Sequence, residues 1–238
     1  MITLLFVFQA LAMPTAEELV KQIDANMNYD TRTAMIKMTV TKRSRTKTYE
    51  MKSHGRGQTE AAVEFLSPPR ERGRKMLKKD ESIWIYLPNA EKTQKLSGHM
   101  LRQGMMGSDM SYQDLLEATQ LSNSYTAKII GEANIDGRLC IQLSLTAKSN
   151  TVAYAKRILW VDKEHIVPLK EELYAVSGKL IKEWTMRDIK DYDGRKFPTK
   201  MTVHDKLLSN SRTEIEFTDL QFQLQLEQEI FNKRWLER

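Results

Sequence analysis

Cysteine, proline and glycine are scarce in this sequence. Its 238 residues include one cysteine, Cys140, with ten glycines and six prolines. One cysteine excludes an intramolecular disulfide and any zinc site built from several cysteines. The low glycine and proline content, together with 41% hydrophobic residues, excludes collagen-like, low-complexity and wholly disordered chains. A hydrophobic core must therefore stabilise the fold, and a chain of this length is long enough to bury one.

Catalytic and metal-binding motifs are also lacking. The four histidines, at positions 54, 99, 165 and 204, are scattered, and the sequence has no HExxH, no GxSxG and no glycine-rich phosphate loop. Cys140 lies in a run of alternating apolar residues, which favours a buried thiol over a nucleophile. We therefore predict that the protein is not an enzyme and that it holds no metal and no cofactor.

An apolar run opens the chain. Ile2–Ala12 carries no charge, is too short for a membrane-spanning helix, and ends in the small-x-small pattern of a cleavage site. We predict a signal peptide over residues 1–12 and a single exported, periplasmic domain over residues 13–238. No lysine or arginine precedes the run. The alternative is therefore a buried first strand or helix.

Residues 15–28 have the periodicity of an amphipathic helix, with Thr15 and Glu18 spaced as a capping box. Beyond them the dominant period is two, as in Ile36–Thr41 and Leu139–Thr146. Asp136-Gly137 indicates a hairpin turn, and a change of phase near residues 218–219 predicts a β-bulge.

About ten strands follow from these signals, at spacings that favour one antiparallel sheet in a mainly β, single-domain fold. Helix is predicted only for residues 15–28, 97–117 and 227–236. So little helix leaves two readings of the apolar sheet face. A strongly curved sheet encloses an apolar cavity, or a second sheet layer packs on it as a sandwich.

Methionine and glycine are concentrated in Ser97–Met110, which contains four methionines and three glycines. Methionine side chains adapt to varied apolar partners, and glycine allows hinge-like backbone angles. The segment is either a mobile lid over a cavity or an ordinary loop plugged into the core.

Positive charge is localised. Residues 37–79 contain 13 Lys and Arg against 4 acidic residues, although the whole chain has a net charge of +6. Such a surface can bind phosphates, anionic headgroups or an acidic partner, and it can also be an ordinary solvated face. No nucleic-acid recognition motif accompanies it, so we expect no nucleic-acid partner.

Several motifs carry a family resemblance: the run Trp84–Pro88, Lys95–Gly98, and Met106–Asp109 followed by Tyr112 and Asp114. Together with Pro68–Leu77 and the ending Glu229–Leu236, they resemble the outer-membrane lipoprotein-sorting protein family of the LolA-like superfamily. The resemblance spans nearly the whole mature chain. It departs from the family pattern at Arg74-Lys75, where smaller or apolar residues are expected.

The resemblance implies an incomplete β-barrel, a curved antiparallel sheet with a few covering helices. It also implies a periplasmic carrier without a cofactor, whose apolar cavity holds acyl chains of lipids or lipoproteins and shuttles them towards the outer membrane. A non-transporting lipid sensor or adaptor of a membrane transporter is the alternative. We expect a monomer, with an inner-membrane transporter as a candidate partner.

On this reading, three groups of residues form the site. The lipid-binding residues are Ile36, Met38, Val40, Val63, Phe65, Ile83, Ile85, Leu139, Ile141, Leu143, Trp184 and Phe217. The lid residues are Met100, Leu101, Met105 and Met106. The residues that touch headgroups or a partner are Arg70, Arg72, Arg74 and Lys75.

Overall fold

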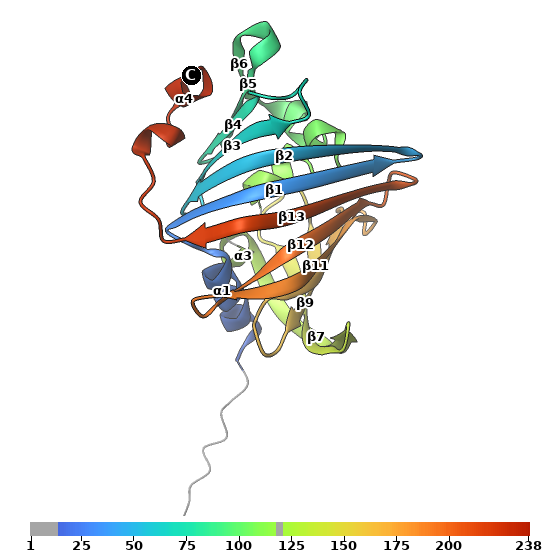
Figure 1. Ribbon diagram of the computed structural model, residues 1–238. Helices are drawn as coiled ribbons and strands as arrows, with labels where there is room; N and C mark the ends of the chain where they lie inside the picture. The colour runs from blue at the N-terminus through green and yellow to red at the C-terminus, as the bar shows by residue number, and fades with distance from the viewer. Residues whose placement is uncertain (1–13, 118–120) are drawn as a thin grey trace, which may run out of the picture.

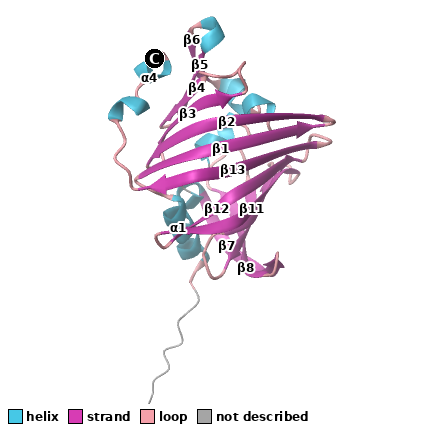
Figure 2. Ribbon diagram, in the orientation of Figure 1, coloured by secondary structure: helices cyan, strands magenta, loops and turns pink. Residues whose placement is uncertain are grey.

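The computed structural model describes residues 14–117 and 121–238, so the predicted signal peptide lies outside the described residues. Over these ranges, thirteen strands form one antiparallel sheet that is not closed into a barrel (Figures 1 and 2). The sheet runs in the order β6-β5-β4-β3-β2-β1-β13-β12-β11-β10-β9-β8-β7. The predicted fold class, a mainly β half-barrel of one sheet, is confirmed.

The strands in chain order are β1 (Thr31–Lys42), β2 (Arg45–Arg56), β3 (Glu60–Ser67), β4 (Lys75–Lys79), β5 (Ser82–Leu87), β6 (Lys92–Leu96), β7 (Tyr125–Ile135), β8 (Arg138–Ala147), β9 (Lys156–Asp162), β10 (Pro168–Tyr174), β11 (Leu180–Tyr192), β12 (Arg195–Asp205) and β13 (Ser211–Phe222). The helical elements are α1 (Ala16–Met27), η1 (Pro88–Ala90), η2 (Gly98–Arg102), η3 (Met105–Gly107), α2 (Tyr112–Glu117), α3 (Leu121–Ser124), η4 (Gln228–Phe231) and α4 (Lys233–Leu236). No helix in the described ranges is long and apolar enough to cross a membrane.

Local sequence explains several of these boundaries. Thr15 caps α1, and its side chain and that of Glu18 bond reciprocally to each other's backbone N–H. Asp136 and Gly137, both at positive φ, join β7 to β8 in a two-residue turn. The predicted bulge is present, because β13 has two residues, Asp219 and Leu220, where β1 has only Ala34.

Side chains of alternate residues point to the two faces of the sheet, which we call the inner and the outer face. The inner face carries two large apolar clusters. One lies on β1–β6 with β11, β12 and β13, and the other on β7–β9, where α1 covers it. In α1, Leu19, Val20 and Ile23 are fully buried against this second cluster. Different chain segments therefore cover different parts of one curved sheet.

Residues 97–117, which contain η2, η3 and α2, cover the first cluster. We call them the closing segment. The C-terminal segment, residues 224–238, instead packs on the outer face of β3–β5 (Figure 1), where Phe231 and Leu236 are buried with Ala62 and Leu77. Helix was predicted for residues 227–236, but the structure has two short helices because Asn232 is extended and caps α4.

Three strands were not expected from the sequence. β4 is a basic run without apolar alternation, and β6 and β7 also lack a clear apolar alternation, so periodicity alone indicates none of the three. β4 lies between β3 and β5, and there its Lys75 and Lys78 are buried. Tertiary context overrides the local polar pattern in this strand.

Candidate functional site

The inner face of β1–β6 gathers most of the predicted lipid-binding residues. One apolar cluster contains Ile36, Met38, Val40, Val63, Phe65, Ile83, Ile85, Trp184 and Phe217. They come together because each points inward at alternate positions of its strand, and because β11 and β13 lie on the other side of β1 from β2–β5.

The remaining three predicted residues lie elsewhere. Ile141 and Leu143 are buried in the second cluster, where α1 packs on them. Leu139 is 50% exposed, outside both inner-face clusters. The alternation in β8 predicts that Leu139, Ile141 and Leu143 share a face, but it does not predict how far α1 covers that face. Leu139 lies outside the covered part, so it does not line the apolar face as expected.

The predicted lid residues pack on the first cluster. Met105 is buried, and Met100, Leu101 and Met106 are partly buried against it. The backbone closes a compact loop in which the Met105 N–H donates to the Met110 carbonyl oxygen. Gly104 is needed there, since a Cβ at this position would lie 2.1 Å from the Ser108 carbonyl oxygen. In this conformation the closing segment fills the space over β1–β6.

Buried polar groups hold the closing segment against the sheet. Asp114, in α2, forms a buried ion pair with Lys182 of β11 and accepts a hydrogen bond of 2.7 Å from the Tyr154 hydroxyl. Burial, followed by the Asp114 charge, raises the pKa of Tyr154. Asp114 also accepts a hydrogen bond from the Ser111 backbone N–H, at 2.6 Å.

A second anchor is Asp109, which is almost fully buried. Its carboxylate accepts a hydrogen bond of 2.7 Å from the Thr213 hydroxyl of β13, and its backbone N–H donates to the same hydroxyl. Lys78 of β4 provides a third anchor by donating to the Leu115 carbonyl oxygen at 2.9 Å. The sequence places Asp109 and Asp114 in the family motifs, but their contacts with the sheet cannot be predicted from it.

The four predicted basic contact residues separate into two pairs. Arg70 and Arg72 are exposed, and Arg70 lines an open hollow of about 510 Å³ with Lys47 and Tyr49. Arg74 forms a salt bridge of 2.7 Å with Glu71. Tyr49, in turn, donates a hydrogen bond to the backbone of the closing segment at Met106.

Lys75 differs from its prediction. It is buried under α4, donates to the Trp235 carbonyl oxygen at 3.1 Å, and lies 4.9 Å from the centre of the Trp235 ring. Its ammonium group is therefore occupied by the C-terminal segment and is not part of an exposed basic surface.

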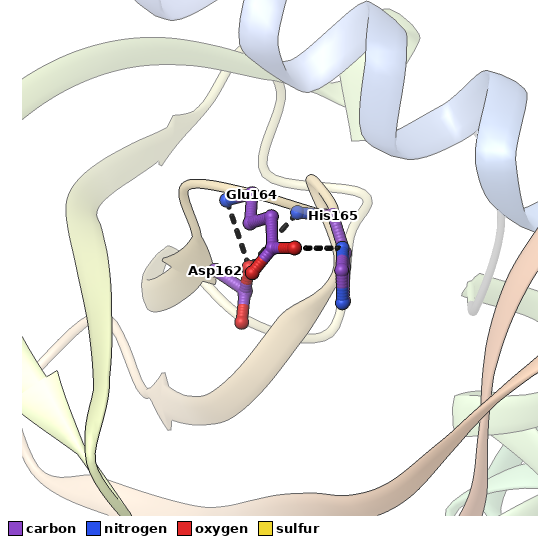
Figure 3. A group of neighbouring side chains, drawn as sticks. All are labelled: Asp162, Glu164 and His165. Carbon is purple, nitrogen blue, oxygen red and sulfur yellow. Dashed lines mark hydrogen bonds and ion pairs between the residues drawn. The ribbon is translucent and has the colours of Figure 1, made fainter.

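One cluster of potential metal ligands, Asp162, Glu164 and His165, lies in the turn after β9 (Figure 3). The Asp162 carboxylate accepts hydrogen bonds from the backbone N–H groups of Glu164 and His165, both at 2.8 Å, and forms a salt bridge with Arg138. Burial is the largest single influence on the pKa of Asp162 and raises it, but these bonds together outweigh burial and lower the pKa. The geometry is that of a turn-stabilising carboxylate.

Cys140 is fully buried, and burial raises the pKa of its thiol. Its thiol donates weakly to the Arg138 carbonyl oxygen at 3.5 Å. Both observations agree with the predicted buried thiol.

The curved open sheet, covered on its inner face by α1 and by a short-helix segment, defines a LolA-like fold. Three solved structures share it. A DUF1329 family protein from Desulfovibrio piger has a TM-score of 0.85 at 22% identity, over 92% of this chain and 97% of its own. An outer membrane lipoprotein-sorting protein domain from Vibrio parahaemolyticus has a TM-score of 0.84 at 23% identity, over 94% and 98%.

The third is a LolA superfamily protein from Nitrosomonas europaea, with a TM-score of 0.77 at 23% identity, over 94% of this chain and 100% of its own. At the level of sequence, residues 57–238 match the model of a family described as "Uncharacterized protein", and the chain belongs to that family. No curated protein matches the chain.

Proposed function

We propose that the protein is a periplasmic carrier that binds acyl chains of lipids or lipoproteins between its inner face and the closing segment, and delivers them towards the outer membrane. The proposal rests on the way in which the closing segment covers the first cluster. A continuous apolar face is covered by a methionine-rich segment of short helical turns instead of a second sheet layer. Export through the predicted signal peptide would bring such a protein to the periplasm.

Acyl binding requires the closing segment to move, because its methionines occupy the apolar face. Burial of an acyl chain contributes about 0.8 kcal/mol per CH₂ group, so a chain of about 16 carbons contributes on the order of 12 kcal/mol. Opening costs about 1–3 kcal/mol for each buried hydrogen bond released and about 1.5–3 kcal/mol for each methionine side chain that loses its burial. An acyl chain that takes the place of the methionine side chains on the inner face offsets much of this cost.

The exposed pair Arg70 and Arg72 supports contact with an acidic partner at the edge of the closing segment. Their strand connection adjoins Tyr49, whose hydroxyl bonds to the Met106 carbonyl oxygen. A partner such as an inner-membrane transporter that docks there would act next to the segment that must open.

Two tryptophans provide a matched test of binding. Trp184 lies on the inner face, whereas Trp160 lies on the opposite face of β9, with Lys170 over its ring at 4.6 Å. A fatty acid with a quenching label on its chain should quench the fluorescence of a Trp160→Phe variant, which retains Trp184. It should have much less effect on a Trp184→Phe variant. Equal quenching in both would rule out acyl binding at the inner face.

A transfer assay then separates a carrier from a sensor. A carrier moves labelled lipid or an acylated peptide from donor to acceptor vesicles at a rate that rises with its concentration. Binding without net transfer would exclude the carrier role and leave the sensor or adaptor role.

A further inference from the structure

One arginine points into the inner face. Arg32 shares the inward side of β1 with Ala34 and Ile36, and its guanidinium carbon lies 4.6 Å from the ring centre of Tyr29. The rings of Phe217 and Phe197 are 5.7 and 5.8 Å away. Three aromatic rings thus surround a permanent positive charge.

No carboxylate balances that charge. Within residues 14–117 and 121–238, Arg32 forms no salt bridge, and its Nε–H group is buried without a hydrogen-bond partner. Two buried cations of the inner face differ in this respect, since Lys182 pairs with Asp114 and Arg157 pairs with Glu171. A third, Lys78, donates instead to the Leu115 carbonyl oxygen. Arg32 as a whole is only partly buried, but a buried Nε–H group without an acceptor is costly, and cation–π contacts offset only part of that cost. The Nε–H group is therefore a donor that a ligand can use.

The apolar face is partly accessible near Arg32, although Ala34 and Phe197 beside it are buried. Ile36, Trp184 and Phe217 are only partly buried, whereas Met38 and Ile83, under the closing segment, are fully buried. The exposed apolar surface therefore continues from the Arg32 site into the region predicted to bind lipid.

A hollow of about 660 Å³ opens at the same end of the sheet, between the end of α1 and the β11–β12 turn. Phe222, which is directly opposite Arg32 on β13, lines it together with Leu220 and Arg195. Two acidic residues also line it. Asp191 forms a salt bridge with Lys196, and Asp193 is exposed in the turn.

We infer that Arg32 binds the anionic headgroup, a carboxylate or a phosphate, of an amphiphile whose acyl chain lies along the inner face towards Trp184. The inference rests on the proposed function and names the chemical class of its ligand. The planar guanidinium can donate two parallel hydrogen bonds to either group, and the contacts with the aromatic rings hold it in place. A neutral lipid of the same chain length would leave the charge unpaired.

Three probes of equal chain length test this inference: dodecanoate, dodecyl phosphate and dodecanol. The two anions are titrated below their critical micelle concentrations, and the alcohol is titrated below its solubility limit. We expect the wild-type protein to bind at least one anion about tenfold or more tightly than the alcohol, in line with the strength of charge-assisted hydrogen bonds. Arg32→Gln should remove that preference and leave dodecanol affinity within about twofold. Lys37→Gln is the control, because it removes one exposed positive charge from the outer face of the same strand.

The outcomes are distinguishable. An anion preference that survives in Arg32→Gln, or that falls equally in Lys37→Gln, overturns the inference but not the proposed function. Absence of binding for all three probes overturns both. In the wild-type protein, the Arg32 Nε–H resonance should shift with the favoured anion and not with dodecanol. This measurement holds even where the glutamine variant fails to fold, and an unshifted resonance would refute the inference.

Discussion

At the scale of single residues, the buried charges of the inner face stabilise one arrangement of the closing segment. Asp114 and Lys182 are each about 7% exposed in their side chains, and neither reaches solvent freely. Removal of one partner from such a pair costs about 3–5 kcal/mol, because the other charge stays buried. The pair is therefore a strong constraint on where α2 lies.

Lys78 is a buried residue whose pH dependence can be measured. Burial lowers its pKa from 10.5 to about 8. Between pH 8 and pH 10.5 the unfolded chain binds more protons than the folded one, so the free energy of unfolding rises with pH in this range. Below about pH 8 Lys78 is protonated in both states, and its contribution no longer changes with pH. From pH 7 to pH 9.5 this residue should add roughly 2 kcal/mol to the free energy of unfolding.

Urea denaturation at both pH values gives the free energy of unfolding of the wild type and of Lys78→Met. The difference between the two proteins should change from pH 7 to pH 9.5 by the contribution of Lys78. The contributions of all other titrating groups cancel because these groups are common to both proteins. Lys37→Met, at an exposed position, should show a difference from wild type that does not depend on pH. A pH-independent difference for Lys78→Met as well would mean that Lys78 is not desolvated.

Residue roles were only partly predictable from sequence. The alternation in β1 and β5 identifies Met38 and Ile83 as inward-facing, because the side-chain period of a strand depends only on local sequence. The partners of Asp109 and Asp114 could not be predicted, since Thr213 and Lys182 are distant in the chain and meet only through the sheet order. Arg32 was not singled out, because a charge inside an apolar face contradicts the pattern used to find that face.

At the scale of elements, signals that are local in sequence were the reliable ones. The capping box of α1, the Asp136-Gly137 turn and the bulge at Asp219 each depend on a few adjacent residues, and all are present. β4 was missed because its lysines are buried by partners from elsewhere: α4 covers Lys75, and the closing segment covers Lys78. The burial of Lys75 therefore depends on the C-terminal segment as well as on the position of β4 in the sheet.

The C-terminal segment should therefore contribute measurably to stability. Leu236 is fully buried on the outer face of β3–β5 with Ala62 and Leu77. Leu236→Ala should lower the free energy of unfolding by about 2–5 kcal/mol, through lost burial and the cavity left behind. Leu207→Ala is the control, since Leu207 is 50% exposed and should cost much less. Guanidinium denaturation measures both, and equal costs would show that α4 is not packed on the sheet in solution.

At the scale of the whole molecule, the two halves of the sheet are covered in different ways. α1 seals β7–β9 with a continuous apolar stripe, whereas the closing segment covers β1–β6 with short turns and a few buried polar anchors. Each anchor joins the segment to the sheet and exists only in the closed form. Loss of one anchor should shift the population towards an open form without weakening the strand pairing itself.

Thr213 offers the sharpest test of this asymmetry. Thr213→Val removes the hydroxyl that bonds to Asp109, and the loss of about 1.4 kcal/mol of closed-state stability raises the open population about tenfold. Under the proposed function only the open form accepts an acyl chain, so the apparent dissociation constant for a labelled fatty acid should fall by up to the same factor. Amide exchange should accelerate at Met105 and Ser108 but not within β8. Thr39→Val, on the outer face of β1, serves as control.

If Thr213→Val leaves both amide exchange and fatty-acid affinity at wild-type levels, the closed form does not limit binding. Acyl chains must then reach the inner face by the open end near Arg32.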